Sequence, residues 1–278
     1  DGGLPDLALL PSPYPLYSDE DIAQRVVYVE ASRGCPFKCQ FCLSSLDKRV
    51  RQVPLERFFD DMETLLERGA RDFKFIDRTF NLKIDVSTRI LEFFLERLHY
   101  GISLHFEMIP DRLPEPLKVL LSRFPPGVLQ LEVGIQTFDL DTAARIERRQ
   151  NYQKTEENLR FLHGETHVHL HTDLIVGLPG ESLESFAVGF DRLLELKPQE
   201  IQVGILKRLK GTPIRMHDES SGMKYNSAPP FDVMETDVLG PEDTEEMKHF
   251  SRLWDRIANS GNFVESLPLI WRENASAF

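Results

Sequence analysis

The sequence predicts an α/β fold built as a partial (β/α)6 barrel. Short runs rich in β-branched and other apolar residues fit strands, and they alternate with longer segments whose apolar residues recur at helical spacing. This alternation repeats six times within residues 24–212 of the 278-residue chain. Because neighbouring parallel strands need a crossover connection, such repeats indicate a parallel sheet. Six repeats are too few for a complete eight-stranded barrel, so we expect an open one.

The expected elements follow one another in a regular order. Strands are expected at 26–30, 73–76, 102–108, 128–135, 167–176 and 201–206. Helices are expected at 55–66, 85–98, 117–124, 140–162 and 183–194. Gly69, Gly101 and the Pro-Pro-Gly run at 125–127 provide stops after the first three helices, and Asp85 is placed to cap the second.

The composition changes at both ends of the predicted barrel. Residues 1–23 are rich in Pro and Leu and indicate a linker. Since the chain does not begin with Met, we expect this linker to be the end of an N-terminal domain outside the sequence. Residues 213–278 break the repeat and are expected to form a mostly helical and loop C-terminal extension. Met247, Phe250 and Trp254 mark one amphipathic helix within it.

Charge limits the classes of function. The chain has 33 Lys and Arg against 45 Asp and Glu, a formal net charge of -12. Nucleic-acid binding needs clustered cations, and we interpret the basic runs at 145–154 and 207–210 as solvated surface, so no nucleic-acid partner is expected. No apolar run is long enough to cross a bilayer, and no signal peptide is visible. These features predict a cytoplasmic protein without a membrane span.

The three cysteines of the chain, Cys35, Cys39 and Cys42, have the spacing C-x3-C-x2-C. Three thiolates this close can hold three irons of a four-iron cluster and leave the fourth iron open. A structural zinc site usually takes four ligands, a ferredoxin-type cluster takes four cysteines, and a disulfide would leave one thiol unpaired. The spacing therefore favours a site-open [4Fe-4S] cluster over these three alternatives.

The motif resembles the signature of the radical S-adenosylmethionine (SAM) superfamily, with Phe41 directly before the last cysteine and a predicted strand ahead of the first. The resemblance implies that the open iron binds the amino and carboxylate groups of SAM. It implies that the reduced cluster cleaves SAM to methionine and a 5′-deoxyadenosyl radical, with Phe41 near the adenine. It further implies a radical SAM barrel, with the cluster at the C-terminal ends of the strands, and an electron donor such as flavodoxin or ferredoxin.

Polar residues on two strands extend this resemblance. Asp77 follows the second predicted strand, where members of the superfamily hydrogen-bond the SAM amino group. On the fourth strand Glu132, Gly134 and Gln136 share one face, and polar groups that face inward need partners. The resemblance implies that Glu132 lies near the ribose or methionine part of SAM, and that Gln136 touches SAM or substrate. The alternative for each is a structural turn or a hydrogen-bonded core position.

Two later segments complete the expected SAM site. Related proteins place an arginine against the SAM carboxylate, and we prefer Arg148 to Arg149 for this role. The turn after the fifth strand resembles the superfamily's adenine motif, which implies that Ile175 and Gly177 lie at the adenine. Glycine there lets the backbone approach the adenine closely. Asp173 on the same strand is expected to contact substrate or ribose.

Three histidines alternate along the fifth strand, at His167, His169 and His171. Alternation puts three imidazoles on one strand face, which raises the hypothesis of a metal site. Side chains on one strand face project in parallel rather than converging on one ion. We therefore expect these histidines to be polar surface or barrel lining.

The resemblance narrows to cobalamin-binding radical SAM proteins with a C-terminal domain of unknown function. The stretches that carry it are 11–14, 75–81 and 225–231. It implies cobalamin-dependent methyl transfer to an unactivated carbon of an unknown organic substrate. The residues then expected at the substrate are Gln136, Asp173 and Glu107.

The chain contains no D-x-H-x-x-G cobalamin motif. Cobalamin is therefore expected to come from a cobalamin-binding domain outside this sequence or from a separate subunit. One alternative function is a cobalamin-independent hydrogen abstraction that leads to oxidation or rearrangement. Another, of a different class, is an electron-transfer iron–sulfur protein.

Overall fold

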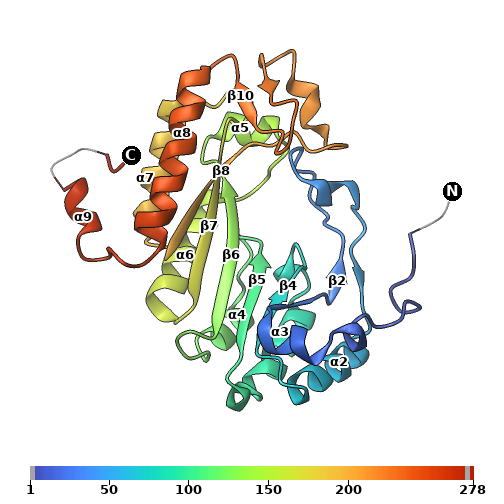
Figure 1. Ribbon diagram of the computed structural model, residues 1–278. Coiled ribbons are helices and arrows are strands. Elements are labelled where there is room, and N and C mark those ends of the chain that lie inside the picture. The colour runs from blue at the N-terminus through green and yellow to red at the C-terminus, as the bar shows by residue number, and fades with distance from the viewer. Residues whose placement is uncertain (1–3, 273–275) are drawn as a thin grey trace.

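The computed structural model describes residues 4–272 and 276–278 and contains the predicted open barrel (Figure 1). Its main sheet has six strands in the order β1-β4-β5-β6-β7-β8, and all neighbouring pairs are parallel. The strands are β1 (Val27–Val29), β4 (Asp72–Phe75), β5 (Ser103–Met108), β6 (Leu129–Gln136), β7 (His169–Val176) and β8 (Glu200–Ile205). Each lies within two residues of its expected bounds, so the fold prediction is confirmed.

Helices connect successive strands and cover the outer face of the sheet (Figure 1). They are α2 (Leu55–Glu67), α3 (Ile84–Leu95), α4 (Glu115–Leu121), α5 (Leu140–Arg145), α6 (Tyr152–Glu165) and α7 (Leu183–Leu194). The helix α2 shows why these segments pack as they do. Its fully buried Phe58, Met62, Leu65 and Leu66 recur at helical spacing and face the sheet. Asp85 lies in the first turn of α3 instead of capping it, and Lys83 occupies the cap position.

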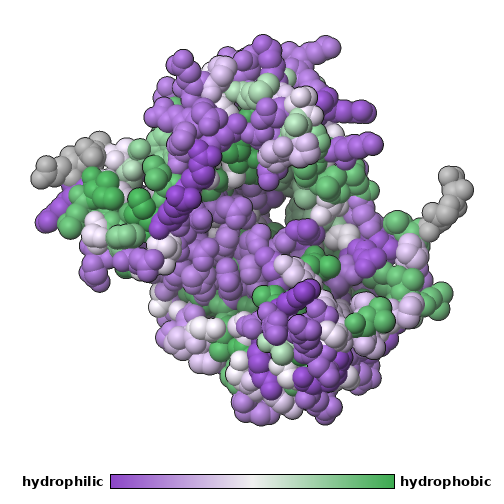
Figure 2. All heavy atoms as spheres, viewed as in Figure 1, coloured by the Kyte–Doolittle hydropathy of each residue, from purple (hydrophilic) through white to green (hydrophobic). Residues whose placement is uncertain are grey.

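Strict alternation along the strands gives the barrel a polar inner face. On β6 the residues from Leu129 to Ile135 at odd positions are buried, whereas Gln130, Glu132 and Gln136 are half-exposed. The strands β5 and β7 alternate in the same way. Figure 2 shows hydrophilic side chains gathered over the middle of the molecule, where Figure 1 places β6 and β7. The apolar core thus lies between sheet and helices, and the inner face is available for polar chemistry.

The helix expected over 140–162 is wrong, because the chain breaks between α5 and α6. The break is a Schellman motif, in which Arg148 N–H donates to Ala143 O at 2.9 Å and Glu147 N–H donates to Ala144 O at 3.2 Å. Glu147 has a φ of 53°, in the left-handed region that glycine usually occupies at this position. A sequence pattern without glycine gives no sign of this turn, which redirects the chain at Arg148.

Both edges of the open sheet are covered by flanking segments. At β1, the Tyr17 hydroxyl donates to Tyr28 O at 3.3 Å, and the Tyr14 hydroxyl accepts from Glu30 N–H at 2.8 Å. The expected linker over 1–23 is therefore partly wrong, because the end of it, together with α1 (Asp19–Gln24), packs on the barrel and buries Tyr14 and Ile22.

The C-terminal extension covers the other edge. Helix α8 (Pro241–Trp254) and the following turn lie along β8, where Ser251 Oγ donates to Val203 O at 2.6 Å. Asn259 bonds both backbone groups of Ile201, at 3.0 and 3.1 Å. The extension also contains the short strands β9 (Lys224–Tyr225) and β10 (Val233–Glu235) and the short helix α9 (Leu267–Ile270). In the described ranges, no helix is both long and apolar enough to cross a bilayer.

Candidate cofactor site

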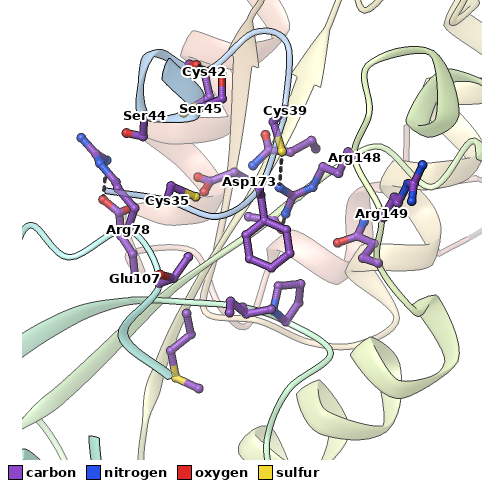
Figure 3. Close-up of a pocket in the computed structure, with 18 of the residues that line it drawn as sticks. Cys35, Cys39, Cys42, Ser44, Ser45, Arg78, Glu107, Arg148, Arg149 and Asp173 are labelled. Carbon is purple, nitrogen blue, oxygen red and sulfur yellow. Dashed lines mark hydrogen bonds and ion pairs between the residues drawn. The ribbon is translucent and has the colours of Figure 1, made fainter. Parts of the chain in front are cut away.

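A cavity of about 240 Å³ opens at the C-terminal ends of the strands, between the sheet and the cysteine loop (Figure 3). The loop comprises residues 34–50. All three cysteines line the cavity, together with polar residues of β5, β6 and β7. The predicted site residues on these strands are Glu107, Glu132, Gln136 and Asp173, and the predicted Arg148 and Phe41 line the cavity as well.

Backbone pairing holds the cysteine loop over the sheet. The short strands β2 (Ser32–Arg33) and β3 (Arg51–Gln52) pair antiparallel at the base of the loop. Just beyond, Cys35 N–H donates to Asp47 O at 2.8 Å. Gly34 has a φ of 102°, and any side chain there would press on the backbone of Arg49. The sequence Gly-Cys is thus needed to turn the first thiol into the cavity.

The three thiols share one cavity wall but do not gather at one point. Cys39 is buried, and Cys35 and Cys42 are half-buried. Figure 3 shows Cys42 beside Ser44 and Ser45, whereas Cys39 lies against Arg148. Among the described residues, no three Cys, His, Asp or Glu side chains converge at metal-binding distance. Burial raises the pKa of Cys35, so the thiol form is favoured here.

Arg148 is the residue that joins the loop to the sheet. Its guanidinium donates to Cys39 Sγ at 3.5 Å, to Ile135 O at 3.3 Å and to Gly134 O. The Schellman turn after α5 places it here. A guanidinium offers five donors in a fixed plane, so the remaining hydrogen-bonding capacity faces the cavity. Arg149 also lines the cavity but is exposed.

Glu132 is held in its ionised form at the floor of the cavity. His105 Nε2 lies 2.9 Å from Glu132 Oε2, and Lys74 Nζ lies 3.5 Å from the same oxygen. The hydrogen bond from His105 lowers the pKa of Glu132 to about 2, with Lys74 adding to the effect. Oxygen Oε2 of Glu132 is thus paired with side chains from β4 and β5.

Asp173 lines the cavity and contacts His171, a polar residue of the same strand. His171 Nε2 lies 3.2 Å from Asp173 Oδ1 and 3.1 Å from Gln202 Oε1. His171 Nε2 donates its hydrogen bond to Gln202 Oε1, and Asp173 Oδ1 is its ion-pair partner. Burial alone would lower the pKa of His171, but the carboxylates of Asp173 and Glu200 outweigh it and raise the pKa to about 10. Burial raises the pKa of Asp173.

The rim of the cavity carries an ion pair that the sequence analysis missed. Arg78 Nη1 lies 2.7 Å from Glu107 Oε1, as Figure 3 shows. Burial raises the pKa of Glu107, and Arg78 opposes that rise. Glu107 therefore lines the cavity as predicted, but with its carboxylate engaged. The sequence does offer a signal for Arg78. Successive side chains of an extended segment point to opposite sides, so a buried Asp77 puts Arg78 on the other side of the chain.

Gln136 folds back over Gly134, on the face where both were predicted. Gln136 has a φ of 75°, and a methyl group on Gly134 would overlap Gln136 Nε2. The same position is also close to the Arg148 guanidinium. Glycine at 134 is thus what allows Gln136 and Arg148 to share this corner of the cavity.

Three predicted cofactor residues are not brought to the cavity. Asp77 is buried with its carboxylate bonded to Ala31 N at 2.9 Å and to Ser32 Oγ at 2.6 Å, so it fixes the end of β1 instead of facing a ligand. Burial raises the pKa of Asp77 to about 6. Ile175 packs in a small apolar cluster of the extension, and Gly177 lies against Val233. Both carboxylate oxygens of Asp77 are thus occupied in this structure, and its predicted contact with SAM stays a prediction.

The histidines of the fifth strand line the barrel, as expected. His169 Nε2 lies 2.6 Å from Glu200 Oε1, and His171 Nδ1 lies 3.1 Å from Glu200 Oε2. His167 precedes β7 and is exposed. Glu200 therefore pairs with both imidazoles through its two carboxylate oxygens. It comes from the next strand, so the residues of β7 alone do not reveal it.

These features define the class of protein. The chain belongs to the radical SAM superfamily, whose family model matches residues 29–192. This is a superfamily of enzymes that use a [4Fe-4S] cluster and SAM. A second family model, for a protein of unknown function (DUF4080), matches residues 219–278 in the C-terminal extension.

Curated relatives include a methylthiotransferase and a methyltransferase. The ribosomal protein uS12 methylthiotransferase RimO of Pelobacter propionicus is 27% identical, over 67% of this chain and 43% of its own length. The cobalamin-dependent radical SAM methyltransferase TokK of Streptomyces tokunonensis is 26% identical, over 76% of this chain and 34% of its own length. The chain thus spans less than half the length of these relatives.

Solved structures show the same fold. The radical SAM methyltransferase TsrM from Kitasatospora setae, with cobalamin and a [4Fe-4S] cluster bound, matches with a TM-score of 0.64 at 20% identity. That match covers 80% of this chain and 46% of TsrM. The cobalamin-dependent SAM radical enzyme OxsB, with aqua-cobalamin and SAM bound, matches with a TM-score of 0.58 at 13% identity, over 83% of this chain and 41% of OxsB.

Proposed function

We propose that this chain carries the cluster and SAM site of an enzyme that transfers a methyl group to an unactivated carbon with the help of cobalamin. The observation that carries the proposal is one cavity lined by three thiols on one side and by Arg148, Glu132 and Asp173 on the other. An electron-transfer protein would have no use for these polar groups beside its cluster.

The residues of the cavity fit a [4Fe-4S] cluster and SAM. Cys35, Cys39 and Cys42 supply three thiol ligands from one loop, which leaves one iron without a protein ligand. Arg148 offers a planar set of donors for a carboxylate. Glu132, kept ionised by His105, accepts hydrogen bonds from an ammonium or hydroxyl group. When bound, the reduced cluster supplies the electron that cleaves SAM to methionine and a 5′-deoxyadenosyl radical.

The chain's own residues orient the bound molecules. Arg148 holds the carboxylate end of SAM against the cysteine loop, and Phe41 covers the adenine. Asp173 and Gln136 face the open part of the cavity, where an organic substrate enters through the gap of the partial barrel. Asp173 is half-buried and its pKa is raised, which suits a group that holds or accepts a proton at the substrate.

The chain contains no D-x-H-x-x-G motif of the kind that binds cobalamin. We therefore assign the cobalamin to a separate domain or subunit over the open end of the barrel. We propose domain borders near residues 23 and 212, with the barrel between them. The required electron comes from a donor such as flavodoxin or ferredoxin. Because the cluster is oxygen-sensitive, we place the protein in the reducing cytoplasm.

The decisive experiment uses the protein produced in cells supplied with cobalamin and reconstituted anaerobically with iron and sulfide. The chain should bind about four irons and release 5′-deoxyadenosine from SAM under reducing conditions. The protein with its cobalamin domain should bind cobalamin and consume SAM to S-adenosylhomocysteine as well. Release of 5′-deoxyadenosine without cobalamin in that protein would favour hydrogen abstraction instead. Bound cluster without any SAM affinity would favour electron transfer.

A further inference from the structure

Gln40 lies inside the cysteine motif, between Cys39 and Cys42, and is only 4% exposed. A buried glutamine needs hydrogen-bond partners for the NH2 group and the carbonyl oxygen of its side-chain amide. Its backbone N–H and C=O need partners as well. Every kind of group on Gln40 has a partner, and the partners come from two other parts of the chain. None of these contacts was expected from the sequence.

The backbone of Gln40 ties the loop in two directions. Its N–H donates to Ile146 O at 3.0 Å, in the turn that delivers Arg148. Its carbonyl oxygen accepts from Ile214 N–H at 3.0 Å, at the beginning of the C-terminal extension. The cysteine loop is thus bonded on one side to the arginine turn and on the other to the extension.

The side chain of Gln40 repeats this connection. Its Nε2 donates to Glu147 Oε1 at 3.3 Å, and its Oε1 accepts from His217 Nε2 at 2.5 Å. A carboxylate can only accept, so the amide nitrogen must face Glu147 and the oxygen must face His217. Glu147 is the residue that takes the left-handed conformation at the Schellman turn. One amide therefore links that turn to His217.

An apolar cluster packs beside these bonds. It contains Ile146 from the turn, Ile214, Met223 and Val233 from the extension, and Phe41 of the cysteine motif against it. The cluster is separate from the main core of the barrel. Gln40 and Phe41 are the two residues between Cys39 and Cys42. Both contact the C-terminal extension.

We propose that Gln40 and His217 are positioning residues through which the C-terminal extension sets the cysteine loop relative to Arg148. This inference rests on the proposed function, since it concerns the same cluster and SAM. It assigns a role to the beginning of the extension, which is to fix the distance between the cluster ligands and the arginine that binds SAM. Residues that support metal ligands from outside typically change metal affinity or activity by about 10- to 100-fold.

The test compares Gln40→Leu and His217→Ala with the parent chain after anaerobic reconstitution. Leu keeps the volume of Gln40 and removes both side-chain bonds, whereas His217→Ala removes one donor from outside the loop. Three quantities are measured: iron content, SAM affinity by calorimetry, and the change in the electron paramagnetic resonance spectrum of the reduced cluster when SAM is added. We expect near-parent iron content, SAM affinity weaker by about tenfold, and a smaller spectral change in both variants.

Two further variants separate positioning from general stability. His217→Gln retains an N–H donor of similar reach and should restore SAM affinity and the spectral change. Asn259→Ala removes two bonds between the extension and β8 at Ile201, far from the cysteine loop along β8. It should lower the melting temperature and leave SAM affinity unchanged. If Gln40→Leu fails to fold, His217→Ala still decides the question.

Parent-like SAM affinity and spectra in both Gln40→Leu and His217→Ala would overturn the inference. An equal loss of SAM affinity in Asn259→Ala would also overturn it, because the effect would then follow the stability of the extension as a whole. A parent chain that binds neither iron nor SAM would overturn the proposed function and this inference together. A parent chain that binds both, with variants that match it, would overturn the inference alone.

Discussion

Gly177 and Val233 are in such close contact that a methyl group on Gly177 would overlap Val233 Cγ1. Gly177 also has a φ of 83°, where a side chain costs roughly 1–2 kcal/mol. We predict that Gly177→Ala lowers the free energy of unfolding by at least this amount, measured by denaturant titration. The matched control is Gly164→Ala, at the exposed end of α6 with no atom near the added methyl group. It should be neutral or stabilise by about 0.5–1 kcal/mol.

Replacing any one of Cys35, Cys39 or Cys42 by Ala should abolish cluster binding. Two thiols cannot hold the cluster that three can. Iron and sulfide content after reconstitution measures the effect, with the parent at about four irons per chain. Ser122→Ala, on the exposed side of α4, is the control and should keep all its iron. A parent that retained tightly bound zinc and no iron would contradict the cluster assignment.

Glu132→Ala and Arg148→Ala should weaken SAM binding and leave the iron content intact. Each change removes a charge-assisted hydrogen bond, which contributes roughly 1.5–3 kcal/mol, or about ten- to hundredfold in affinity. Calorimetry with SAM on the reconstituted protein measures the loss. Glu63→Ala is the control, since Glu63 is paired with Arg97 on the outer helices. Unchanged affinity in both site variants would show that SAM binds elsewhere.

Glu181 should make the stability of the fold depend on pH. It is 3% exposed, it accepts from the Thr137 hydroxyl, and its second oxygen has no partner among the described residues. Burial raises the pKa of Glu181 from 4.5 to about 8. The unfolded chain loses this proton near its ordinary pKa and the folded chain only near pH 8. The stabilisation is therefore complete at low pH and lost as the pH rises between these values.

We predict that Glu181→Gln removes this dependence. The variant should match the parent at about pH 5 and become more stable than it toward about pH 8, by at most about 1.4 kcal/mol for each pH unit. Urea unfolding at several pH values measures the difference. Glu184→Gln, at the exposed start of α7, should show no such slope. A parent whose stability relative to Glu181→Gln is constant with pH would refute the buried, protonated carboxyl.

The strands could be predicted because each is defined by its own residues. From Leu129 to Gln136, apolar residues that pack on the helices alternate with polar residues that face inward. This period of two can be seen in the local sequence itself. The same holds for Glu132 and Gln136, whose shared face follows from strand geometry. The cysteine spacing is local too, and it was the signal that pointed to the cavity.

The remaining parts depend on partners far away in the chain. Asp77 bonds Ala31, 46 residues earlier, so its burial could not be recognised from its own neighbourhood. Glu147 takes a glycine-like conformation within a turn whose contacts reach back to Gln40, 107 residues earlier. Gln40 itself meets His217, 177 residues away. A single sequence carries no local trace of such pairs.

The side chains that bond the two edge strands of the sheet bear on self-association. They are the two tyrosines at β1, and Ser251 and Asn259 at β8. An incomplete barrel has two free strand margins, and unpaired backbone groups there invite another chain to add a strand. Here hydroxyl and amide side chains occupy several of those groups. These side chains therefore leave fewer backbone groups at either edge of the open barrel for the strand of another chain to pair with.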